Sequence, residues 1–141
     1  MKFLPEEFYR KVIKSVPILC VDLVIENGKE TLLIKRKIPP CKGYWCLIGG
    51  RVHYGERVLD AVRRQAKDEL GLKIKIEKFI GVYDNPKRDP NKHAVSLAYM
   101  VKPVGGKMRT GPESSEIKFF GKLPKRIGFD HRKILNDAGF E

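Results

Sequence analysis

Apolar positions along the chain alternate between strand-like and helix-like spacing, and this pattern predicts a mixed α/β fold. Short runs rich in Leu, Ile, Val and aromatic residues are typical of strands. The predicted strands cover residues 17–26, 31–37, 45–48, 73–83, 93–102 and 117–121. Helical spacing and start signals predict helices at residues 5–15, 56–70 and 130–138. This order of elements favours a mixed sheet packed between helices, without fixing the order of its strands.

Turn and cap residues predict where several of these elements end. Asn27-Gly28 lies between the first two predicted strands and is typical of a tight hairpin turn. Gly71 follows the central helix and is expected to end it in a left-handed conformation. Asp130 is expected to cap the last helix. Loops are expected near residues 39–43, 84–86 and 103–112, where Pro, Gly and polar residues gather.

The chain has 141 residues, which suits a single domain spanning 1–141 with one core. Its wholly apolar runs, such as residues 16–21, are far shorter than the roughly 20 residues of a membrane-spanning helix. The N-terminal residues lack the apolar centre of a signal peptide. We therefore expect a soluble, cytoplasmic protein. Its three cysteines form no CxxC pair, so free thiols are expected.

Positive charge dominates the chain, with 29 Lys and Arg against 17 Asp and Glu and a net charge of +12. Such a charge attracts anions, either nucleotides or nucleic acid. The basic residues are spread along the whole sequence, so most of them are expected to be a solvated surface. Charge alone therefore does not identify the ligand.

Acidic residues of the central helix suggest where the chemistry lies. Gln65, Asp68 and Glu69 fall within about a third of a turn of one another, beside the apolar face. Neighbouring carboxylates repel unless a cation neutralises them, and such oxygen ligands suit Mg²⁺ or Mn²⁺. Arg51 and Arg64 offer forked donors for phosphate groups. The competing interpretation is a solvated helix whose charges only form surface ion pairs.

Residues 50–72 resemble the Nudix box, G-x5-E-x7-R-E-U-x-E-E-x-G-U, where U is aliphatic. The positions that fit in register are Gly50, Glu56, Arg64, Glu69, Gly71 and Leu72. The resemblance implies a Nudix-type α/β/α sandwich with a mixed β-sheet, in which the box forms a loop, a helix and a loop that hold a divalent metal. Gln65 and Asp68 stand where the box has Glu. Because a Gln cannot accept a proton, Gln65 cannot replace the base that many family members use. The site also keeps fewer negative charges, so one Mg²⁺ is expected.

Within this family, the chain is most similar to the GDP-mannose mannosyl hydrolases. The similar segments are residues 3–4, 21–27, 32–36, 43–45, 49–52 and 69–72. That subfamily also lacks the box Glu at position 65, and its members attack the sugar carbon and release GDP. The resemblance therefore implies Mg²⁺-dependent hydrolysis of a nucleotide sugar to a nucleoside diphosphate and a free sugar.

The same resemblance implies a role for each site residue. The metal ligands would be the carbonyl of Gly50 and the carboxylates of Glu69, Asp68 and Glu113. Arg51 and Arg64 would steady the leaving diphosphate, Asp22 would hold the sugar and Arg36 would contact the nucleotide. Glu113, with Glu116 next, replaces the subfamily's late-loop base. Ser114, Ala94 and Asn85 stand where the subfamily has a His, a Tyr and a His, which weakens the case for mannose.

Several single residues have simpler expected roles. Glu56 is expected to brace the box loop by pairing with an arginine, and Trp45 to pack in the core. His131 is expected at the surface and His93 in a structural role, whereas His53 could approach a phosphate. The Gly105-Gly106 pair is expected to be a flexible connector.

Two other functions remain open from the sequence. One is a Nudix pyrophosphatase that cleaves the phosphoanhydride of ADP-ribose, a nucleoside triphosphate or a dinucleotide. The other is a nucleotide- or RNA-binding module with a degraded box. A membrane partner is not expected, and nucleic acid is the less favoured ligand. The resemblance also implies a homodimer joined through the N-terminal segment.

Overall fold

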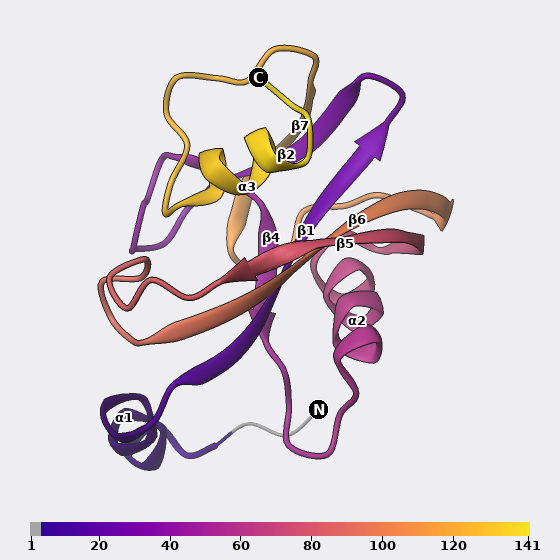
Figure 1. Ribbon diagram of the computed structural model, residues 1–141. Helices are drawn as coiled ribbons and strands as arrows, with labels where there is room; N and C mark the ends of the chain where they lie inside the picture. Colours follow the sequence, from indigo (N-terminus) through magenta and orange to yellow (C-terminus); the bar gives the residue numbers. More distant parts are fainter. Residues whose placement is uncertain (1–3) are drawn as a thin grey trace.

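A mixed seven-stranded sheet organises residues 4–141, the part of the chain that this computed structural model describes (Figure 1). The helices are α1 (Glu6–Ser15), α2 (Val58–Leu70) and α3 (His131–Asp137). The strands are β1 (Ile18–Asn27), β2 (Glu30–Arg36), β3 (Trp45–Cys46), β4 (Ile48–Arg51), β5 (Leu72–Tyr83), β6 (Ala94–Gly106) and β7 (Ser114–Phe120). Phe3, part of the segment at residues 3–4 that entered the resemblance, lies outside the described residues.

Strand β1 is the centre of the sheet, whose main order is β3-β2-β1-β6-β5. It runs parallel to β6 and antiparallel to both β2 and β4. The first half of β1 pairs with β4, so that Asp22 lies opposite Gly49 and Cys20 opposite Arg51. Its second half pairs with β2, and β7 joins the other side of β2. The double-glycine turn is thereby fixed beside the start of the central strand.

Side-chain alternation along the strands builds one core on each face of the sheet. Val21, Leu23 and Ile25 of β1 pack with Val62 and Leu70 of α2. On the opposite face, a second cluster packs against α3, and its members include Val24, Leu33, Met100, Ile134 and Leu135. Figure 1 shows α2 and α3 on opposite sides of the sheet. The predicted α/β/α arrangement is confirmed.

Local turn signals predicted boundaries well. Gly28 turns the β1–β2 hairpin with φ 64°, and Gly71 ends α2 with φ 69°. The central helix begins at Val58 rather than at residue 56, because Glu56 is still part of the box loop and its N–H donates to the His53 carbonyl.

Four expectations about the strands and the last helix were wrong. The predicted strand at 45–48 is two strands, β3 and β4. The predicted loop from residue 103 starts too early, because β6 continues through Gly106, which pairs with Leu72. Gly105-Gly106 is therefore part of a strand and not a flexible connector. Asp130 precedes α3 but forms no side-chain cap; its carboxylate binds Arg88 instead.

Two other expectations were confirmed. Trp45 packs in the second cluster, with its ring centroid 4.8 Å from that of Phe120. Cys20, Cys41 and Cys46 are free thiols. Among the helices of the described chain, none has the length and apolar character needed to cross a membrane.

Candidate active site

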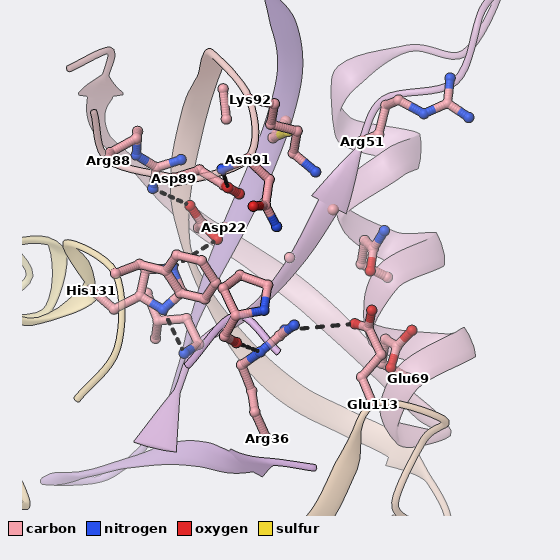
Figure 2. Close-up of a pocket in the computed structure, with 18 of the residues that line it drawn as sticks. Asp22, Arg36, Arg51, Glu69, Arg88, Asp89, Asn91, Lys92, Glu113 and His131 are labelled. Carbon is pink, nitrogen blue, oxygen red and sulfur yellow. Dashed lines mark hydrogen bonds and ion pairs between the residues drawn. The ribbon is translucent and has the colours of Figure 1, made fainter. Parts of the chain in front are cut away.

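A pocket of about 470 Å³ opens where β1, β4 and α2 meet the loops before β6 and β7 (Figure 2). It collects side chains from segments that lie far apart in the sequence. All the predicted site residues line it, namely Asp22, Arg36, Gly50, Arg51, Arg64, Asp68, Glu69 and Glu113. The fold thus brings the whole predicted set to one cavity.

Carboxylates gather where α2 faces the loop before β7. Glu69 is half-buried, and Glu113 reaches toward it from the loop (Figure 2). A Cβ built on Gly111 of that loop would lie 2.6 Å from a Glu69 carboxylate oxygen, so the loop packs closely on this side chain. Burial raises the pKa of Glu69, and the charges of Glu113 and Asp68 raise it further. The site therefore concentrates negative charge that a cation would relieve.

A divalent cation fits this donor set only if water and the substrate supply part of its coordination shell. No group of three His, Cys, Asp or Glu side chains in residues 4–141 could enclose a metal ion. Mg²⁺, however, usually takes one or two carboxylates and completes its shell with water and substrate phosphates. Glu69 and Glu113, with Asp68 beside them, supply that many. Gly50 also borders the pocket, where Gln65 packs against it and leaves no room for a Cβ.

Glu56 braces the box loop by pairing with an arginine, as predicted, and that arginine is Arg64, which the resemblance had assigned to the leaving diphosphate. The Arg64 guanidinium donates to both Glu56 carboxylate oxygens, at 2.7 and 3.0 Å, and to the Arg51 carbonyl at 3.0 Å. Glu56 also accepts the N–H of His53 at 3.0 Å. The hydrogen bond from Arg64 is the main reason that the pKa of Glu56 is lowered. Arg64 thus fixes the turn that carries Arg51 and His53 into the pocket.

Arg36 is held at the pocket edge by its own loop. Its Nε donates to the Pro40 carbonyl at 2.7 Å, and its guanidinium lies 5.4 Å from the centre of the Phe129 ring. Its Nη1 is 4.0 Å from a carboxylate oxygen of Glu113. A guanidinium held over a ring can contact an aromatic base or a phosphate.

A buried charge network forms the floor of the pocket, and sequence reasoning missed half of it. Arg88, from the loop before β6, has a side chain that is 6% exposed. It donates to Asp22 at 3.0 Å and twice to Asp130 at 2.8 Å. Burial lowers the pKa of Arg88, but the hydrogen bonds and charges of Asp130 and Asp22 outweigh this and raise it.. Asp22 accepts a further bond from Ser96 at 2.6 Å.

His131 belongs to the same network, which corrects the surface position expected for it. It is 5% exposed. Its Nδ1 accepts the backbone N–H of Leu47 at 3.0 Å, and its Nε2 lies 3.5 Å from Asp22. Burial lowers its pKa, so the ring is neutral near pH 7 and carries its proton on Nε2. Its partners lie far away in the chain, so no local signal marked it.

Comparisons with known proteins show the family of this chain. A model of the NUDIX domain matches residues 16–136. An ADP-ribose pyrophosphatase from Methanocaldococcus jannaschii is 43% identical over 123 residues, which cover 86% of this chain and 72% of that protein. The low-salt glycan biosynthesis protein Agl8 from Haloferax volcanii is 28% identical over 123 residues, covering 83% of this chain and 79% of that protein.

The fold has solved counterparts as well. The crystal structure of a MutT NUDIX hydrolase from Burkholderia pseudomallei aligns with a TM-score of 0.78 and 28% identity, covering 88% of this chain and 99% of that one. The family model spans most of the chain, and the box residues form one pocket with the glycine turn. On these grounds the chain belongs to the Nudix family and is a Nudix hydrolase.

Proposed function

We propose that this Nudix hydrolase uses Mg²⁺ to cleave the diphosphate bridge of a nucleoside diphosphate linked to a ribose, with ADP-ribose as the favoured substrate. The observation that carries the proposal is the pocket that Glu69 and Glu113 share with Arg36 and Arg51. The relative with 43% identity, an ADP-ribose pyrophosphatase, supports the same substrate class. The pyrophosphatase hypothesis fits the relatives better than the hypothesis of GDP-mannose hydrolysis does.

Each side chain has a task in that reaction. Glu69, with Asp68 and the Gly50 carbonyl nearby, would hold the cation, which when bound polarises phosphate oxygens and acidifies water. Arg36 would contact the nucleotide, and Arg51 would neutralise charge that grows on the diphosphate. Gln65 cannot take a proton, so the remaining base is a carboxylate. Glu113, on a loop and 41% exposed at its side chain, is the one we assign to deprotonate the attacking water.

A second candidate is attack at the sugar carbon of a nucleotide sugar, such as GDP-mannose. Gln65 favours it, because this side chain stands where phosphorus-attacking family members use a carboxylate. Asp22, which the resemblance assigned to the sugar, is already engaged by Ser96, Arg88 and His131. These contacts leave the Asp22 carboxylate less able to accept hydrogen bonds from a sugar.

Hydrolysis in ¹⁸O-labelled water separates the two reactions. With ADP-ribose and Mg²⁺, we expect AMP and ribose 5-phosphate, with the label in a phosphate group, because water attacks phosphorus and the bridging bond breaks. GDP-mannose is the comparison substrate. Label in a free sugar, with a nucleoside diphosphate as product, would establish carbon attack instead. If neither compound turns over, the binding-module alternative gains support.

Glu113→Gln is expected to lower kcat by about 10²- to 10⁴-fold, the usual contribution of a general base. Glu30→Gln, an exposed change at the start of β2, should keep the wild-type kcat. A large loss in Glu116→Gln with normal activity in Glu113→Gln would move the base to Glu116.

A homodimer and a cytoplasmic location stay predictions. Within the described chain, α1 has no buried residue, although its helix is amphipathic and carries the half-exposed Phe8. A second copy could cover this face.

A further inference from the structure

Arg51 and Lys92 lie at the end of the pocket away from Glu69 and Glu113 (Figure 2). Arg51 is the last residue of β4, and Lys92 belongs to the loop before β6. Tyr9 reaches the same place from α1. Residues from three separate segments thus converge on one corner of the cavity.

Tyr9 orders both cations. The Lys92 ammonium donates to the Tyr9 hydroxyl at 3.5 Å, and the Arg51 guanidinium lies 5.7 Å from the centre of the same ring. Each contact lowers the number of rotamers that a long basic side chain would otherwise sample. Such preordering reduces the entropy that a ligand must overcome when it binds.

Neither Arg51 nor Lys92 forms an ion pair with a carboxylate of residues 4–141. The acid on the same loop, Asp89, also lines the pocket and accepts the backbone N–H of Asn91 at 2.8 Å. The other basic side chains of this region behave differently, since Arg64 is paired with Glu56 and Arg88 with Asp22 and Asp130. Arg51 and Lys92 both contact Tyr9 and neither has an acidic partner, so a bound anion would be attracted to both charges.

The loop holds Lys92 firmly in place. Arg88 ties the loop to the pocket floor, and the carbonyl of His93 accepts the N–H of Ile18 at 2.8 Å. Lys92 lies between these two anchors. The position of its backbone therefore follows from the fold, and the contact with Tyr9 directs its side chain.

We propose that Lys92, Arg51 and Tyr9 form an anion subsite for the phosphoryl group of the substrate that lies farther from Glu69. The inference rests on the proposed function, because it requires that the pocket binds a nucleoside diphosphate group. One phosphoryl group would then lie near the carboxylates and their cation, and the other between Lys92 and Arg51. The subsite makes the pocket prefer diphosphates to monophosphates.

Calorimetric titration of the intact protein with ADP and with AMP, in EDTA, tests this subsite without turnover. Lys92→Met, which keeps the length of the side chain but removes its charge, should weaken ADP binding about tenfold, the usual loss for a charge-assisted hydrogen bond. AMP binding should change less than about twofold. Lys92→Arg should retain most of the ADP affinity. Lys87→Met, an exposed change on the same loop that does not line this pocket, should match the wild type.

Equal weakening of ADP and AMP in Lys92→Met would overturn the subsite and indicate only long-range attraction. Unchanged ADP binding, or a wild type that binds ADP no better than AMP, would also overturn it. Thermal unfolding of each variant checks that the fold is intact. Since ADP is not the proposed substrate, failure to cleave ADP-ribose would sink the proposed function and leave this result standing.

Discussion

Glu69→Gln is expected to lower kcat by about a thousandfold while leaving the metal-free protein at least as stable as the wild type near pH 7. The loss in rate is of the size seen when a preorganised electrostatic contact to the transition state is removed. The stability follows from the environment of the side chain. Glu69 is half-buried, and burial together with Glu113 and Asp68 raises its pKa, so its ionised form is disfavoured in the folded protein. A neutral amide avoids that cost.

The direction of the pH effect follows from the same shift. An acid whose folded pKa is raised contributes stability below its ordinary pKa of 4.5, and this contribution is lost as pH rises through the folded value. Without metal, wild-type stability relative to Glu69→Gln should therefore decline from acidic to neutral pH. Mg²⁺ should restore it in the wild type only, because a ligand that binds the folded state stabilises that state.

Urea unfolding at pH 5 and pH 8, in EDTA and in Mg²⁺, measures both effects. Glu77→Gln, an exposed change on β5, is the control and should respond to Mg²⁺ as the wild type does. A Glu69→Gln protein that is active and still stabilised by Mg²⁺ would contradict the metal role. One that is strongly destabilised without metal would instead indicate a structural ion pair.

The part of the site that spacing along the chain predicted is encoded locally, whereas Asp22, Arg36 and Glu113 were assigned through the resemblance. Gly50 lies in β4, Glu56 in the loop that follows, and Arg64 and Glu69 in α2, so their spacing alone determines that they meet. Gly71 could be assigned as the helix end for the same reason, because a left-handed cap is a property of a single residue.

Pairings between distant segments could not be predicted in the same way. Arg88 is 66 residues from Asp22, and His131 is 84 residues from Leu47. The loop with Arg88 reaches Asp22 because β1 and β6 run parallel in the middle of the sheet, which also brings Ser96 opposite Cys20, two residues from Asp22. Strand order was the one feature that the pattern of apolar residues left open. Long-range partners depend on it, so they were missed or, like His131, placed at the surface.

Ion pairing also explains how a strongly basic chain can contain a site with a cluster of carboxylates. Arg64 and Arg88 serve the framework, since both bind carboxylates that brace the pocket. Arg51 and Lys92 have no such carboxylate among the described residues, and the contact of Arg36 with Glu113 is long, at 4.0 Å. The net charge of +12 therefore does not indicate the ligand. The distinction between cations that are paired with carboxylates and cations that are not is more informative.

Arg88→Met is expected to destabilise the protein by about 3–5 kcal/mol, the usual cost of removing one partner from a buried ion pair. Met keeps much of the side-chain volume, so the loss comes mainly from the carboxylate of Asp22, which is 9% exposed and would lose its cation. The loop that carries Lys92 would also lose one of its two anchors. KM for ADP-ribose should therefore rise in the same variant. Urea unfolding and steady-state kinetics measure the two effects.

A second substitution separates lost charge pairing from lost packing. Adding Asp22→Asn to Arg88→Met removes the uncompensated carboxylate, so part of the stability should return, whereas KM should stay high because the loop is still untethered. Arg63→Met, which breaks an exposed pair with Asp60 at 3.3 Å, is the matched control and should cost less than about 1 kcal/mol. If Arg88→Met costs no more than this control, Arg88 is not the anchor of the loop. If the double variant is no more stable than Arg88→Met, the penalty lies in packing rather than in the buried charge of Asp22.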